Sequence, residues 1–202
     1  MAIVKSDNNF NNLNEKEPIL IKIIVAGTIC LGKTFFMNRI QYYSKNEKFN
    51  FQNLETNYIP TIGRDFTIFN YKIKNKLFKV QIWDISGQER WKDTVYYLAR
   101  GAGAIILFYN SFDRNSFFKA MEFYTNLYKS YSKSIYVLIK SKYDLPLKAE
   151  NNNDFVCDEE ALEFADKNDI IFAHLSNFEK YETGINELFE KIFLKFIKIS
   201  QI

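Results

Sequence analysis

Cysteine and histidine are scarce in this chain of 202 residues, and their scarcity excludes several kinds of site. Cys30 and Cys157 are the only cysteines and lie far apart, so the sequence contains neither a disulfide framework nor a CxxC metal motif. We therefore expect a reducing, cytoplasmic compartment. His174 is the only histidine, which leaves little room for a histidine-based triad or a zinc site, and we expect it to be structural.

Long hydrophobic runs are also lacking. No apolar run approaches the roughly 20 residues that a membrane-spanning helix needs. The first five residues turn polar at once, which is unlike a signal peptide. The last five contain no cysteine, so no prenyl motif is present.

Charge of one sign is not in large excess, since the net charge is +3 and both signs are interspersed. Such a chain has no strong field for nucleic acid, and we expect no nucleic-acid partner. Apolar residues make up 47% of the chain, enough for the core of one domain. Most of residues 1–17 are polar and show no periodicity. This predicts a mobile tail over residues 1–17, followed by one domain over 18–202.

Short apolar runs alternate with segments of helical character through the rest of the chain. The predicted strands are 19–26, 66–73, 77–83, 104–109, 135–139 and 170–173, and the predicted helices are 34–43, 115–128, 158–167 and 184–199. Strands that alternate with helices predict an α/β fold with a mostly parallel sheet covered on both faces. The hairpin through Lys74-Asn75-Lys76 would add one antiparallel edge strand, giving six strands. Ligands of such sheets bind beyond the carboxyl ends of the strands.

A phosphate-binding motif follows the first of these strands. Gly27-Thr28-Ile29-Cys30-Leu31-Gly32-Lys33-Thr34 fits G-x-x-x-x-G-K-[ST] between a strand and a helix. Its backbone N–H groups and the start of the helix can cradle phosphate oxygens. Lys33 would supply charge to the β and γ phosphates, and the Thr34 hydroxyl would ligate Mg²⁺. The alternative is a plain strand–helix turn with a surface lysine.

Two residues in the middle of this loop differ from the small residues that many phosphate loops have there. Cys30 carries a Cβ, which costs little only where φ is negative. The branched side chain of Ile29 can crowd a γ-phosphate. Both residues favour weaker catalysis.

A second phosphate-sensing segment, Asp84-Ile85-Ser86-Gly87-Gln88-Glu89-Arg90, follows another β-rich run. Asp84 at a strand end can hold Mg²⁺, directly or through water. The Gly87 N–H can face a γ-phosphate, and Gln88 can orient an attacking water. Taken alone, the motif would indicate only a turn.

The same segment, with Trp83 before it, resembles W-D-T-A-G-Q-E-R of the Rab GTPases. Upstream, Thr61-Ile62-Gly63-Arg64-Asp65-Phe66 resembles T-I-G-x-D-F of the Rab first switch, and the likeness extends over roughly residues 18–198. The resemblance implies the P-loop NTPase fold, and it implies that Thr61 completes the Mg²⁺ shell and senses the γ-phosphate. Phe66 and Trp83 match two of the three aromatic residues that Rabs present to effectors, and Leu98 falls at the third.

Two later segments resemble the base-reading motifs of that family. Ser141-Lys142-Tyr143-Asp144 stands where the family has N-K-x-D. Asp144 can accept hydrogen bonds from guanine N1–H and the 2-amino group, a donor pair that adenine lacks. The Lys142 stem can lie across the base, while Ser141 replaces an asparagine, which predicts weaker guanine affinity. Ser176 and Asn177 stand where the family has S-A-K, and a backbone N–H there can meet guanine O6.

Together, the motifs and the resemblance predict a Mg²⁺-dependent switch that binds GTP and GDP, hydrolyses GTP slowly and serves vesicle traffic. Effectors, an exchange factor and a GTPase-activating protein are the partners that the resemblance implies. It also implies a cytoplasmic protein, peripheral at most on the cytosolic face of an endomembrane. Two alternatives stay open: a nucleotide-binding interaction module with little turnover, and an ATP-using P-loop enzyme.

Overall fold

The computed structural model describes residues 3–4, 17–45, 61–142, 154–175 and 183–201, and the structural statements below concern these residues. Its strands are β1 (Ile3–Val4), β2 (Ile19–Ala26), β3 (Arg64–Ile73), β4 (Lys76–Ile85), β5 (Ala104–Asn110), β6 (Ile135–Ser141) and β7 (Ile171–Leu175). Its helices are α1 (Lys33–Lys45), the 3₁₀ turn η2 (Glu89–Trp91), α2 (Lys92–Leu98), α3 (Arg114–Tyr131), α4 (Asp158–Lys167) and α5 (Thr183–Ser200).

The strands form one mixed sheet in the order β1-β3-β4-β2-β5-β6-β7. Strands β4, β2, β5, β6 and β7 run parallel, and β3 pairs antiparallel with β4. The predicted six-stranded α/β sheet with one antiparallel strand is therefore confirmed. The short strand β1 adds a seventh, antiparallel and outside β3. Ile3 and Val4 of the predicted polar tail thus belong to the sheet, and residues 5–16 lie outside the described residues.

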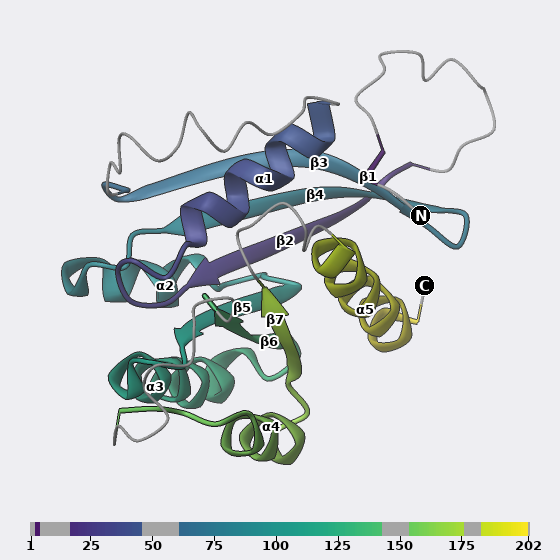
Figure 1. Ribbon diagram of the computed structural model, residues 1–202. Coiled ribbons are helices and arrows are strands. Elements are labelled where there is room, and N and C mark those ends of the chain that lie inside the picture. The colour runs from purple at the N-terminus through teal and green to yellow at the C-terminus, as the bar shows by residue number, and fades with distance from the viewer. Residues whose placement is uncertain (1–2, 5–16, 46–60, 143–153, 176–182, 202) are drawn as a thin grey trace.

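Helices cover both faces of the sheet, as Figure 1 shows. Helices α1 and α5 pack on one face, and α2, α3 and α4 pack on the other. The strands β5 and β6 are buried on both faces, which explains why their sequences read as continuous apolar runs rather than alternating ones. None of the described helices is both long enough and apolar enough to span a membrane.

The β3–β4 hairpin turns at Lys74 and Asn75, while Lys76, the third residue of the predicted connection, already belongs to β4. Lys74 and Asn75 have φ values of 45° and 59°, the positive pair that a two-residue type I′ turn requires. Helix α2 was not predicted, because it has seven residues and buries only Val95 and Leu98. So short an apolar pattern cannot be told from a loop.

All the parallel strands end at the same edge of the sheet. The loops that follow β2, β4, β5 and β6 therefore meet there, and these loops carry the predicted phosphate, metal and base motifs. The fold brings together what the sequence separates by more than a hundred residues.

Candidate nucleotide-binding site

The phosphate loop runs from the end of β2 to the start of α1. Gly27, Cys30 and Gly32 have positive φ values of 144°, 60° and 79°, which curl the backbone around the loop centre. A Cβ on Gly27 would lie 2.8 Å from the carbonyl oxygen of Phe108 in β5, so only glycine fits at the first position. The loop geometry therefore matches the requirement of the motif, in which backbone N–H groups come close to phosphate oxygens.

Cys30 has the left-handed φ that the sequence analysis identified as costly. For a residue with a Cβ, the left-handed region costs roughly 1–2 kcal/mol. The side chain is exposed, and Ile29 beside it is 56% exposed. Neither Cys30 nor Cys157 forms a disulfide within the described part of the chain.

Lys33 lies inside the loop with its side chain 6% exposed. Its Nζ donates a hydrogen bond to the carbonyl oxygen of Thr28, 2.6 Å away. Burial lowers the pKa of Lys33 to about 8, and the nearby charges of Asp84 and Cys30 only partly oppose this. A bound phosphate would stabilise the charged form of the Lys33 amine, so the environment of Lys33 favours the binding of an anionic ligand.

Three oxygen-bearing side chains from three segments meet next to Lys33. The Thr34 hydroxyl lies 2.6 Å from the Thr61 hydroxyl and donates to Asp84 Oδ2 at 2.5 Å. Thr61 also donates to the same Oδ2 at 3.3 Å. The predicted metal ligands Thr34, Thr61 and Asp84 are therefore brought together, although they span 51 positions of the sequence.

The chemistry of this cluster fits magnesium. Asp84 is 1% exposed, and its Oδ1 is buried with no hydrogen-bond partner among the described residues. Burial raises the pKa of Asp84, while hydrogen bonds from Thr34 and Thr61 and the charge of Lys33 oppose the rise. A hard divalent cation takes carboxylate, hydroxyl, water and phosphate oxygens, which is the donor set that these side chains and a nucleotide offer.

The segment after β4 packs directly on the phosphate loop. A Cβ on Gly87 would lie within 2.4–2.5 Å of backbone atoms of Thr28 and Ile29, so a side chain there would push the two loops apart. Gln88 follows, and with Gly27 and Thr28 it lines a small cavity of about 20 Å³. Gly87 and Gln88 are thus adjacent to the phosphate loop, where their predicted roles place them.

A second contact joins the two segments that carry Thr61 and Gly87. The Ser86 N–H donates to the carbonyl oxygen of Gly63 at 2.9 Å, and the Trp91 ring lies 3.5 Å from where a Gly63 Cβ would be. Sequence reasoning missed Trp91 and the buried Ser86. The sequence shows only that a glycine, Gly63, stands in one segment and that an aromatic residue directly follows Arg90 in another. Nothing in the sequence indicates that these two residues are in contact.

At the base-reading edge the structure describes Ser141 and Lys142. Ser141 is 2% exposed, and its hydroxyl donates to the carbonyl oxygen of Tyr109 at 2.9 Å, which directs it toward β5. Lys142 has a positive φ of 57°, which turns the chain sharply after β6. Asp144, Ser176 and Asn177 lie outside the described residues, so the binding roles given to these five residues stay predictions.

The aromatic pair expected at the switch surface is present. Phe66 stacks on Trp83 with ring centroids 5.0 Å apart, and Phe66 is 51% exposed. Leu98, at the third position, is 6% exposed and belongs to the core beneath α2, so it contributes nothing to that surface. Its neighbour Tyr97 is 79% exposed.

His174 serves packing in the described structure, away from the phosphate loop. Its Nε2 lies 3.6 Å from Asp158 Oδ2, and the other oxygen of that carboxylate accepts from Lys140 Nζ at 2.7 Å. These contacts tie the start of α4 to β6 and β7.

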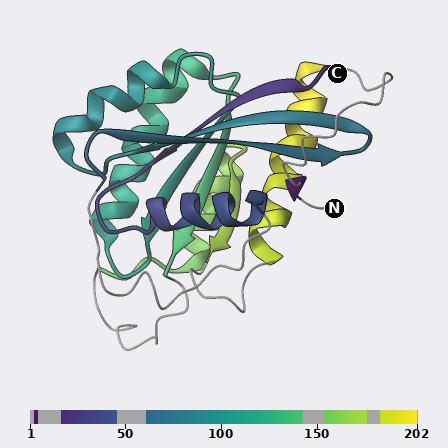
Figure 2. The ribbon, with the colours of Figure 1, turned by 90° about the horizontal axis from the view of Figure 1, so that it is seen from above.

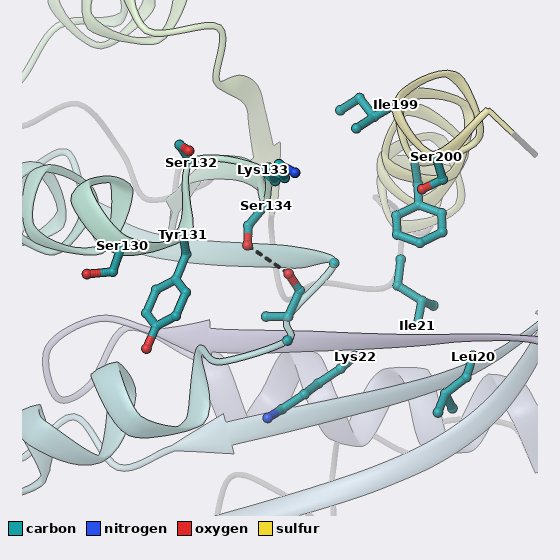
Figure 3. A pocket seen from close by; sticks show the side chains of 14 residues that line it. Leu20, Ile21, Lys22, Ser130, Tyr131, Ser132, Lys133, Ser134, Ile199 and Ser200 are labelled. Atoms are coloured by element: carbon teal, nitrogen blue, oxygen red, sulfur yellow. Dashed lines mark hydrogen bonds between the residues drawn. The ribbon is translucent and has the colours of Figure 1, made fainter.

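A larger cavity lies at the opposite edge of the sheet, with a volume of about 600 Å³. It is an open hollow lined by the start of β2, the loops before β5 and β6, and the end of α5 (Figure 3). Ligands of parallel α/β sheets bind at the carboxyl ends of the strands. This cavity is at the other ends, so it is distinct from the nucleotide site.

A parallel α/β sheet with a phosphate loop, a buried lysine and a cluster of oxygen ligands at its carboxyl edge defines a P-loop nucleotide-binding protein. Comparison with protein families matches residues 22–198 to the Ras family. The chain belongs to the Ras family, as a Rab-like small GTPase.

Individual Rab proteins match most of the chain. It is 32% identical to Ras-related protein Rab-11B of Dictyostelium discoideum over 89% of this chain and 76% of that protein. It is 32% identical to Rab-13 of Canis lupus familiaris over 86% of this chain and 78% of that protein. It is 30% identical to RABA4d of Arabidopsis thaliana over 95% of this chain and 80% of that protein.

Proposed function

We propose that this chain is a guanine-nucleotide switch that binds GTP with Mg²⁺ and hydrolyses it slowly to GDP. The observation that carries the proposal is the convergence of Thr34, Thr61 and Asp84 beside the buried Lys33. Family membership supports guanine nucleotides as the ligand class and argues against an ATP-using enzyme. Asp144 would supply the discrimination against adenine, since a carboxylate there accepts from the two guanine donors.

The switch follows from the two segments that reach the γ-phosphate. Thr61 lies at the start of β3 and Gly87 just after β4, and the Gly63–Ser86 hydrogen bond couples them. A γ-phosphate would hold both segments, and its loss would release both. A coupled release would change the surface around Phe66 and Trp83, which we propose as the contact for effectors.

In hydrolysis, water attacks the γ-phosphorus and the bond to the β-phosphate oxygen breaks. Gln88 would orient the water, the Gly87 N–H would hold the γ-phosphate, and Lys33 would stabilise charge on the β and γ oxygens. Mg²⁺, when bound by Thr34, Thr61 and Asp84, supplies neutralisation of the phosphate charge. None of these side chains provides an arginine, and Arg90 contacts the Trp91 ring, so an activating protein would supply one.

A second candidate function is a nucleotide-binding module with little turnover. The strained Cys30 and the exposed branched Ile29 in the phosphate loop favour it. The two candidates share binding and differ in chemistry. We also propose that the switch serves vesicle traffic at the cytosolic face of an endomembrane, with an exchange factor as a further partner, in keeping with its Rab relatives.

Single-turnover hydrolysis of bound GTP separates the two candidates. For the GTPase, Gln88→Leu should lower the rate by tenfold or more while GDP affinity stays unchanged. Gln81→Leu, in β4 away from the site, is the matched control and should leave the rate unchanged. A wild-type rate no faster than that of Gln88→Leu would favour the binding module.

A further inference from the structure

The part of the β3–β4 hairpin nearest its turn is basic and contains no acidic residue. Between Phe66 and Trp83 the chain has four lysines, Lys72, Lys74, Lys76 and Lys79, and no aspartate or glutamate. In a protein whose net charge is only +3, this is a local concentration of one sign. The nucleotide site does not use it, since the hairpin tip lies at the far ends of strands β3 and β4.

The strand register places Lys72 and Lys79 on one face of the sheet, and Lys74 lies in the turn at the hairpin tip. Lys76 pairs with the buried Ile73 and therefore belongs to the other face. Lys72 pairs with Leu77, and Lys79 is opposite Leu20 of β2, so these side chains point to the same side. The alternate residues of the hairpin, including Tyr71 and Phe78, are buried against α5 on the other side. In Figure 3, Leu20 and Lys22 extend from one side of β2 and Ile21 from the other.

This surface, which we call the lysine face, consists of Leu20, Ile68, Lys72, Leu77 and Lys79, with Lys74 at the turn that ends it. It is open: Lys72, Lys74 and Lys79 are exposed, and Leu20 and Ile68 are 58% and 45% exposed. Figure 2 shows the hairpin extending away from α2 and toward α5, so the helices that cover this side of the sheet elsewhere leave its tip uncovered.

Two charges of the lysine face have no acidic partner among the residues that the structure describes. Lys74 and Lys79 form no salt bridge with any residue in this part of the chain. The two acids that bound the hairpin in sequence, Asp65 and Asp84, pair with each other across the strands at its opposite end. The cavity beside β2 adds Lys22 and Lys133 and is lined by no acidic residue.

We propose that the lysine face docks the protein on an anionic phospholipid membrane. Lysines spread over a broad sheet face, with aliphatic side chains between them, suit a surface of many phosphate charges, to which each lysine adds independently. Leu20 and Ile68 would enter the interfacial layer. A protein partner would be expected to anchor on aromatic or arginine side chains, and these lie at the other end of the strands, at Phe66 and Trp83.

The test is sedimentation of the full chain, loaded with GDP and Mg²⁺, with vesicles of phosphatidylcholine containing about 30% phosphatidylserine. Wild type should bind these vesicles, should not bind pure phosphatidylcholine, and should dissociate at about 0.5 M NaCl, where charges are screened. The double variant Lys74→Asn, Lys79→Thr should bind about 25-fold more weakly, about fivefold for each lysine. Asparagine tolerates the positive φ of residue 74, and threonine suits the exposed strand position of residue 79.

The matched control is Lys167→Gln, Lys191→Gln, which removes the same two charges from exposed positions on α4 and α5. It should bind as wild type does. Equal weakening in both double variants would mean that net charge alone is responsible and would overturn the proposal. So would absence of wild-type binding, or equal binding to soluble polyglutamate, which would assign the face to an acidic protein.

The proposal does not depend on nucleotide chemistry. Retention of GDP by both double variants shows that they are folded, whatever the vesicle result. Leu20→Gln gives an independent readout, because it keeps every charge. It should weaken binding to anionic vesicles severalfold at low salt, where its charged contribution equals that of wild type.

Discussion

Asp84 has a buried carboxylate whose second oxygen has no hydrogen-bond partner in the described structure, and such an oxygen suits a cation ligand. Its other oxygen accepts from both threonine hydroxyls, so the three side chains contact one another. A bound Mg²⁺ would replace these mutual hydrogen bonds with ligand bonds.

Replacing this carboxylate should therefore remove the effect of magnesium on nucleotide release. We expect Asp84→Asn to abolish the slowing of GDP dissociation by Mg²⁺, measured as release of a fluorescent GDP analogue with Mg²⁺ or with EDTA. Asp65→Asn changes the cross-strand neighbour, which is exposed, and should keep the full difference. If Asp84→Asn still responds to Mg²⁺ as wild type does, Asp84 is not a ligand.

Cys30 is a strained residue in the phosphate loop, with a φ of 60°. Cys30→Gly should raise the free energy of unfolding by about 1 kcal/mol, because glycine adopts this φ without steric cost. Urea unfolding of nucleotide-free protein measures it. The control Cys157→Gly, at a residue with φ of −73°, should give no gain. A loss of stability in Cys30→Gly would contradict the strain.

At the scale of elements, the site depends on close contact between two loops. Gly87→Ala would place a Cβ against the backbone of Thr28 and Ile29, and backbone cannot give way as a flexible side chain can. We expect a loss of about 1–3 kcal/mol in unfolding free energy, as for overpacking in a core. Gly184→Ala, near the start of α5, should be near neutral, because alanine favours helix and the atom nearest its Cβ would be the end of the Leu175 side chain, 3.2 Å away. Equal effects of the two substitutions would argue against the loop contact.

The helices and strands also show how much of the fold can be predicted from the sequence. All of the described strands except β1, the hairpin turn and four of the helices follow from apolar periodicity and turn residues. The motifs locate Lys33 and Thr34 because they open a helix after a strand, and Asp84 because it stands near a strand end. Apolar periodicity does not predict α2, because a helix of seven residues is too short to show a periodic pattern. It could not reveal that Trp91 packs on Gly63, since that contact depends on how β3 and β4 bring their ends together.

The direction in which a side chain points could not be predicted from the sequence either. Ser141 occupies a motif position, yet its hydroxyl bonds to Tyr109 of the adjacent strand. Leu98 matches an aromatic position of Rab proteins, yet it is buried. In both cases the register of neighbouring strands and helices decides the environment, and a single sequence does not encode that register locally.

For the whole molecule, the account divides two functions between two regions. Nucleotide and Mg²⁺ would bind at the carboxyl edge of the sheet, and the lysine face lies at the hairpin end. Because the segments carrying Thr61 and Gly87 join this same hairpin to the phosphates, the region that senses nucleotide is covalently continuous with the region that we propose meets the membrane.

Nucleotide binding should stabilise the whole fold selectively. GDP at about 1,000 times its Kd adds roughly 4 kcal/mol, which for a domain of this size raises Tm by about 8–16 °C. ADP at the same concentration should leave Tm nearly unchanged. Lys33→Met should lose most of the GDP effect, while Lys129→Met, exposed on α3, should keep it. A shift of equal size with ADP would contradict guanine selectivity.

The central claim is that the loop of residues 27–34 holds the phosphates of a guanine nucleotide. The most direct measurement is the identity and amount of nucleotide released when the purified protein is denatured in the presence of a chelator and separated by chromatography. The account predicts GDP or GTP at close to one molecule per chain. Protein that is folded, carries no guanine nucleotide and takes up none when GDP and Mg²⁺ are supplied would contradict it.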